Sequence, residues 1–140
     1  MPALDYCHQQ VVRALRKNGW EIDPRPYFVR IEGLTLFADI QAHRRTSDNG
    51  QIQQIIIVEV KCFTDQRSDQ DELYRALGQY LLYRSALRAR GISSPLYLAI
   101  PTLAYLRLFS KSLVLDTVRE AGIKLIIVDV DREEVVEWLD

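Results

Sequence analysis

The feature that most constrains the fold is an aliphatic run that contains two opposite charges. Residues 55–63 read IIIVEVKCF. Side chains alternate between the two faces of a strand. The even-numbered residues from Val58 to Cys62 therefore form an apolar face, while Glu59 and Lys61 share the other face, about 7 Å apart. This segment predicts a buried strand with one packed face and one charged face.

The rest of the chain alternates between helical and strand patterns. The expected helices are 2–20, 71–91 and 110–121. The expected strands are 27–31, 34–41, 52–63, 94–101 and 123–130, with 133–139 as an edge strand or a short closing helix. The order α-β-β-β-α-β-α-β predicts an α/β fold with a mixed central sheet flanked by helices. At 140 residues, the chain has the usual size of one domain, so 1–140 is expected to be a single domain.

The charge balance excludes a large basic field. The formal net charge is −1, which argues against non-specific coating of nucleic acid but allows a local basic patch. The candidate clusters are Arg13/Arg16/Lys17, Arg44/Arg45 and Arg84/Arg88/Arg90. Each cluster can equally be a solvated face.

The two cysteines, Cys7 and Cys62, have no CxxC spacing. We expect reduced, buried thiols in a cytoplasmic protein. The N-terminus lacks the features of a signal peptide, and no apolar run reaches the length of a membrane span, so no membrane association is expected. His43 falls in a polar segment, 43–51, that is expected to be a loop.

An aspartate can join the charged face of the central strand. Asp39 lies in the expected strand 34–41, on the face opposite to Leu36, Ala38 and Ile40. If this strand pairs with the central one, the aspartate stands beside the glutamate of the E-V-K tripeptide. Two adjacent carboxylates repel, and a divalent cation such as Mg²⁺ resolves the repulsion. A nearby lysine completes the chemistry of metal-assisted phosphodiester hydrolysis.

Two helical features extend this candidate site. Gln79 and Tyr83 are four positions apart, hence on one helix face, and both side chains can hydrogen-bond to phosphate or to metal-bound water. His8 lies on the apolar stripe of the first helix, where it is a core residue, a ligand or a phosphate contact. The simpler alternative for Glu59 and Lys61 is an exposed ion pair on a half-solvated strand.

The residues Asp39, Glu59-Val60-Lys61, Gln79 and Tyr83 resemble the PD-(D/E)XK nuclease superfamily, which has a restriction-endonuclease-like core. The resemblance implies that Asp39, Glu59 and the carbonyl of Val60 hold Mg²⁺ or Mn²⁺, and that Lys61 is catalytic. It also implies that Gln79 and Tyr83 support the site or touch DNA. His8 matches a first-helix metal ligand of some members. Ala38 stands where many members have proline, and in the absence of a first-helix glutamate only Asp5 or His8 can substitute.

A narrower resemblance covers nearly the whole chain. The segments at 1–20, 58–63, 76–87, 96–101 and 129–140 are similar to the XisH family, the fdxN element excision controlling factors of cyanobacteria. This resemblance implies a role in programmed excision of a DNA element during heterocyst development. It also implies DNA and an XisI-like protein as partners, with strand exchange carried out by a separate recombinase.

Three functions therefore remain open from the sequence. The first is a Mg²⁺-dependent DNA endonuclease, and the second is a non-catalytic factor that binds DNA or an XisI-like protein. The third is one half of a toxin–antitoxin-like pair. A two-fold homodimer suits duplex DNA, although no residue pattern specifies it.

Overall fold

The computed structural model of the chain describes residues 6–64 and 68–140. The helices are α1 (His8–Lys17), α2 (Asp69–Ala89), α3 (Thr102–Ala104), the π-helical turn η2 (Tyr105–Phe109) and α4 (Ser112–Glu120). The strands are β1 (Glu21–Ile22), β2 (Tyr27–Ile31), β3 (Leu34–Ala38), β4 (Ile40–Arg45), β5 (Ile52–Val60), β6 (Leu96–Pro101), β7 (Lys124–Asp129) and β8 (Glu134–Leu139). Within these ranges, no helix has the length and hydropathy that a membrane crossing needs.

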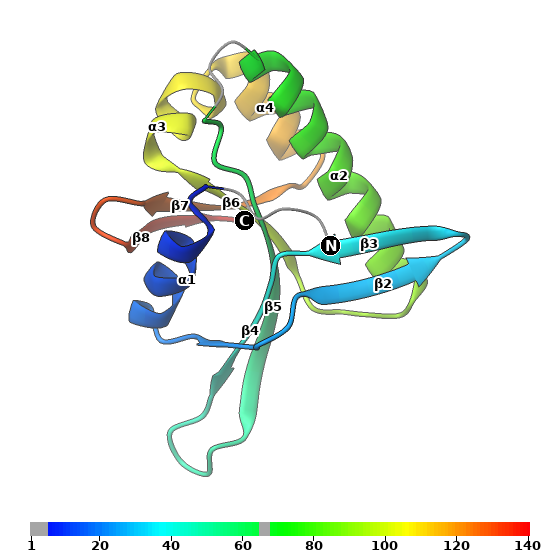
Figure 1. Ribbon diagram of the computed structural model, residues 1–140, viewed down its shortest axis with the longest axis vertical. Coiled ribbons are helices and arrows are strands. Elements are labelled where there is room, and N and C mark those ends of the chain that lie inside the picture. The colour runs from blue at the N-terminus through cyan, green and yellow to red at the C-terminus, as the bar shows by residue number, and fades with distance from the viewer. Residues whose placement is uncertain (1–5, 65–67) are drawn as a thin grey trace.

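The main sheet is mixed, as the sequence predicts. Its six strands run in the order β1-β4-β5-β6-β7-β8, and the three central strands β5, β6 and β7 are parallel. The outer pairs β1–β4, β4–β5 and β7–β8 are antiparallel. A separate hairpin, β2–β3, lies beside α2, and the β4–β5 hairpin extends away from the rest of the molecule (Figure 1).

The two faces of β5 pack into two separate cores. Val58 and Val60 are buried against α1 residues such as Leu15. Ile57 is buried on the other face, with Tyr80 of α2. The alternation predicted for the central strand is therefore confirmed. Helices cover both sheet faces because the parallel strands are apolar on both.

The chain passes from one sheet to another at Asp39. Among the described strands, β3 pairs only with β2, whereas β4 pairs with β5 from Ile40 onward. Ala38 packs in the α2-side core and Ile40 in the α1-side core, although residues two apart in a regular strand share a face. The prediction of one continuous strand over 34–41 is therefore wrong. The prediction that Leu36, Ala38 and Ile40 share one face is wrong as well. Asp39 occupies the corner that this change of sheet creates.

Other expectations need smaller corrections. His43 lies in β4 and not in a loop, because β4 extends to Arg45 as the partner of β5. The segment 133–139 forms the edge strand β8 and not a helix. The helix expected at 110–121 is preceded by α3 and η2, which the sequence pattern missed. Pro2 and Asp5 lie outside the described residues.

The expectation of two reduced thiols is wrong. Cys7 and Cys62 form a disulfide, with their Cα atoms 5.8 Å apart across 55 positions of sequence. The sulfur of Cys62 also accepts a hydrogen bond from the Cys7 N–H, at 2.9 Å. The two residues meet because α1 begins at the end of β5 that carries Lys61. The disulfide therefore ties the first helix to the strand of the candidate site.

One consequence of the packing is a loss of stability at high pH. Burial, followed by a hydrogen bond with Asp140, raises the pKa of Tyr97 to about 12. Unfolded tyrosine titrates near about pH 10, so between about pH 10 and about pH 12 the folded state binds more protons. The free energy of unfolding should fall as pH rises through this window.

Replacing Tyr97 with phenylalanine should make that alkaline decline shallower. Urea unfolding, followed by circular dichroism across this pH range, measures the effect. Tyr6→Phe is the control, because Tyr6 is 82% exposed. An identical pH dependence in Tyr97→Phe and the unmodified protein would contradict this explanation.

Candidate functional site

Asp39 binds the backbone of the central strand. Its Oδ2 accepts a hydrogen bond from the N–H of Val60, at 2.8 Å. The last β4–β5 pair is Ile40 with Val58, so the antiparallel register places Asp39 opposite Glu59. The β4 backbone stops pairing with β5 at Ile40. Beyond that point the Asp39 side chain takes its place as the hydrogen-bond partner of β5.

The same geometry orients the carbonyl of Val60. In a β-strand, the N–H and C=O of one residue point to the same edge. Since the Val60 N–H points to Asp39, its carbonyl oxygen points to that edge as well. Three oxygen-bearing groups, from Asp39, Glu59 and Val60, therefore gather at the end of β5.

Tyr83 of α2 faces this oxygen cluster. Burial, and then the negative charge of Glu59, raises the pKa of the Tyr83 hydroxyl above its usual value, and Asp39 adds to the effect. A backbone hydrogen bond from Phe37 in β3 acts in the opposite direction. Both carboxylates therefore lie within electrostatic range of Tyr83. A tyrosine hydroxyl is protonated at neutral pH, and this shift preserves that state, so Tyr83 can donate a hydrogen bond to an anion.

Gln79 lies one helical turn before Tyr83, on the same face of α2. Its Oε1 atom is buried and makes no hydrogen bond to any residue within 6–64 or 68–140. Buried amide oxygens in folded proteins nearly always have a partner, which can be an ordered water. Gln79 therefore shares the helix face of Tyr83, the residue on which both predicted carboxylates act.

Glu59 is 5% exposed. It lies on the α2 side of β5, since residues two apart in a strand share a face and Ile57 packs on that side. A buried carboxylate must have its charge compensated by partners. The simple alternative of an exposed ion pair with Lys61 therefore does not describe Glu59.

Lys61 follows β5 directly and continues its pairing. Its N–H donates to the carbonyl of Ala99, at 3.0 Å, so the lysine side chain leaves on the same face as Glu59. It lines a cavity of about 120 Å³ together with Glu72 and Arg75 from the start of α2. Sequence analysis missed these two α2 residues. Both lie on the helix face of Gln79 and Tyr83, with Arg75 one turn and Glu72 two turns before Gln79, so the helical repeat could have identified them.

His8 lies on the other side of the sheet. It is 8% exposed on α1, whose buried residues pack against the face of β5 opposite to Tyr83. Its Nδ1 makes no hydrogen bond to a residue in the described part of the chain. The structure thus does not bring His8 to the oxygen cluster, and its proposed ligand role stays a prediction.

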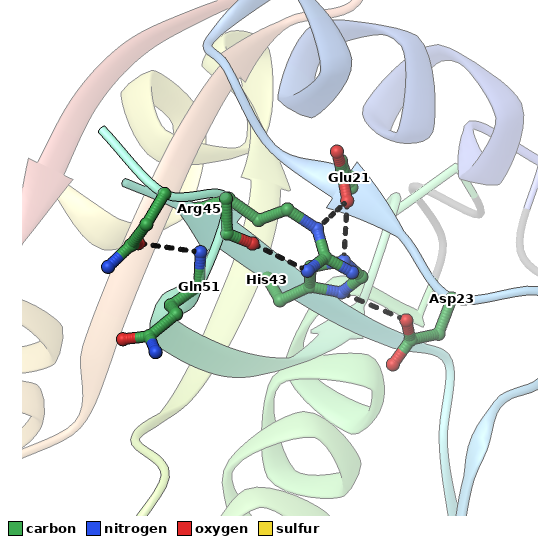
Figure 2. A network of polar contacts seen from close by, with 7 residues as sticks. Glu21, Asp23, His43, Arg45 and Gln51 are labelled. Atoms are coloured by element: carbon green, nitrogen blue, oxygen red, sulfur yellow. Dashed lines mark hydrogen bonds and ion pairs between the residues drawn. The ribbon is translucent and has the colours of Figure 1, made fainter. Parts of the chain in front are cut away.

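A second polar cluster joins β1 to β4 (Figure 2). Nε2 of His43 lies 2.6 Å from Glu21, and Nδ1 lies 3.0 Å from Asp23. Arg45 also contacts Glu21, at 3.0 Å, and the bonds from Arg45 and His43 lower the pKa of Glu21. Both ring nitrogens of His43 face carboxylates, so neither is free to bind a metal. This network fastens the short edge strand β1 to the sheet.

The donors at the end of β5 suit a hard cation. Within the described ranges, no group of three or more His, Cys, Asp and Glu residues is placed to hold a metal ion. Mg²⁺, however, often binds through one or two carboxylates plus waters. The carboxylates of Asp39 and Glu59 and the carbonyl of Val60 are all hard oxygen ligands. Their chemistry fits Mg²⁺ or Mn²⁺.

The fold is that of a mixed α/β protein, and its candidate site has two carboxylates, Asp39 and Glu59, where the central strand ends. The chain belongs to the XisH family, because the family model described as "XisH protein" matches residues 1–136. This agrees with the resemblance seen in the sequence. No protein with a curated description matches the chain.

Two solved structures support the family membership. The chain is similar to an XisH family protein from Nostoc punctiforme PCC 73102 whose crystal structure is known, with 36% sequence identity and a TM-score of 0.84. This match covers 97% of this chain and 100% of that chain. The structure of a fdxN element excision controlling factor protein from Anabaena variabilis is 35% identical, with a TM-score of 0.83. It covers 95% of this chain and 97% of that chain.

Proposed function

We propose that this protein is a factor for programmed excision of a DNA element, and that it acts there as a Mg²⁺-dependent DNA endonuclease of the PD-(D/E)XK type. The excision role rests on the family and on the name of the Anabaena variabilis relative. The nuclease role rests on one observation: Asp39, Glu59 and Tyr83 converge at the end of β5.

The proposed roles follow from the geometry. Asp39, Glu59 and the carbonyl of Val60 would hold the metal. When bound, Mg²⁺ would supply stabilisation of negative charge on a phosphodiester and make a bound water more acidic. Lys61, on the face of Glu59, would orient the attacking water or stabilise the developing anion.

The α2 residues would complete the site. The protonated hydroxyl of Tyr83 can donate to a phosphate oxygen. The buried Oε1 of Gln79 can accept from a water on the same side. Neither residue would react itself, so their replacement should affect binding and positioning more than chemistry.

Metal binding tests the proposal directly. Calorimetric titration with Mn²⁺ should show binding to the unmodified protein, and Asp39→Asn should weaken it at least about tenfold. Asp116→Asn, an exposed aspartate on α4, makes the same chemical change and should leave the affinity unaltered. Absence of binding at millimolar Mn²⁺ would contradict the proposal that the protein is a metal-dependent nuclease.

A second candidate function is a non-catalytic accessory factor that binds DNA or an XisI-like protein and positions a recombinase. One observation favours it: an oxygen of Asp39 is already committed to the Val60 N–H, and no third acidic ligand joins the pair within the described ranges. Binding of DNA or of the XisI-like protein in metal-free buffer, without any metal affinity, would select this function.

A further inference from the structure

A recess on the other side of α2 has the composition of an anion site. A cavity of about 510 Å³ lies between the second half of α2, the start of β6 and the start of β7. Two arginines of α2, Arg84 and Arg88, line it together with Lys124 of β7. No acidic residue in the described part of the chain lines it, although the whole chain has a net charge of −1.

Arg84 is held in place by the turn that precedes β7. Its Nη1 donates to the carbonyl of Ala121 at 2.7 Å and to that of Gly122 at 3.1 Å. Gly122 has a φ of +66°, which favours glycine, and a Cβ there would lie 3.6 Å from the same guanidinium nitrogen. The arginine is therefore fixed by backbone contacts and by the ring of Tyr80, whose centroid lies 5.6 Å from its guanidinium carbon.

Arg88 and Lys124 also line the recess. Arg88 is exposed and lies four positions after Arg84 on α2. Two positive charges at this spacing repel each other and destabilise a helix. Lys124 borders the recess near its backbone, whose N–H donates to the hydroxyl of Tyr80 at 3.1 Å, whereas its ammonium lies over the ring of Tyr97, 6.0 Å from the ring centroid. Among residues 6–64 and 68–140, no carboxylate forms an ion pair with any of the three.

The rest of the lining is suited to a small organic molecule. Ser93 and Ser94 offer hydroxyl groups, whereas Leu87, Ile92 and Leu96 form an apolar wall. The volume falls in the usual range of small-molecule sites, about 300–1,000 Å³. Arginine favours phosphate, because a guanidinium group can donate more than one hydrogen bond to it.

This recess is separate from the oxygen cluster of Asp39 and Glu59. Tyr83 turns towards β3, as its backbone bond from Phe37 shows, whereas Arg84 turns towards the turn before β7. α2 therefore presents the two sites to different sides. We propose that the recess binds a small phosphate monoester with an apolar or aromatic body, such as a nucleotide.

Titration calorimetry with adenosine monophosphate, in buffer with a metal chelator, tests this proposal. The unmodified protein should bind the nucleotide more tightly than inorganic phosphate, and adenosine should show no binding. Arg88→Glu should weaken binding at least about tenfold. Arg16→Glu, the same charge reversal on the exposed side of α1, should not. Circular dichroism should show that all variants remain folded.

Three results would overturn the proposal. The first is no nucleotide binding at millimolar concentration. The second is equal affinity in Arg88→Glu, Arg16→Glu and the unmodified protein. The third is binding of a DNA oligonucleotide that depends on Arg88 while the mononucleotide does not bind.

Discussion

Replacing Lys61 with alanine should reduce Mg²⁺-dependent nicking of supercoiled DNA by roughly 100-fold or more. Asp39→Ala should cause a loss at least as large. The lysine lies on the face of Glu59, directly after the strand whose end carries both carboxylates. Its charge would act where negative charge develops during phosphodiester hydrolysis. A gel assay of supercoiled and relaxed plasmid, with Mg²⁺ and with Mn²⁺, measures the rate.

Matched controls separate the site from general effects of charge. Lys111→Ala removes an exposed lysine at the start of α4, and Asp116→Asn neutralises an exposed aspartate in that helix. Both should nick DNA at the unmodified rate. Equal activity in Lys61→Ala, Asp39→Ala and the unmodified protein would show that any nicking comes from elsewhere or from a contaminant.

Loss of the Cys7–Cys62 disulfide should lower the free energy of unfolding by about 2–4 kcal/mol. For a chain of this length, that corresponds to a decrease in Tm of roughly 10 °C. The physical reason is that the bond closes a long loop, since the cysteines are 55 positions apart. Breaking it enlarges the conformational freedom of the unfolded chain.

Thermal unfolding with and without dithiothreitol measures this effect. The reductant should destabilise the unmodified protein and have no effect on the double variant Cys7→Ala/Cys62→Ala. Reduced and unmodified protein should differ in free thiol content when both are denatured. Two free thiols in the denatured, unreduced protein would contradict the disulfide.

The parts of the fold that depend on local periodicity could be predicted. The alternation around Glu59 separates an apolar face from a charged face, and the structure keeps that separation because both faces pack against helices. The spacing of Gln79 and Tyr83 likewise survives, since both lie on one long helix. These features need only the repeat of a strand or a helix.

The parts that depend on tertiary contacts could not be predicted. The corner at Asp39 arises because β3 and β4 join different sheets, which no local pattern between Leu34 and Gln41 reveals. The disulfide requires α1 to begin beside the end of β5, and a pair of cysteines so far apart has no spacing rule. Glu72, by contrast, lies on the predictable α2 face and could have been included.

The location of a bound metal ion tests the central claim most directly. A crystal of this protein soaked in Mn²⁺, with data collected to locate anomalous scattering, would place the ion. We expect one peak within coordinating distance of the carboxylates of Asp39 and Glu59 and of the Val60 carbonyl. A crystal at millimolar Mn²⁺ that shows no peak there, or a peak held only by other residues, would contradict the proposed site.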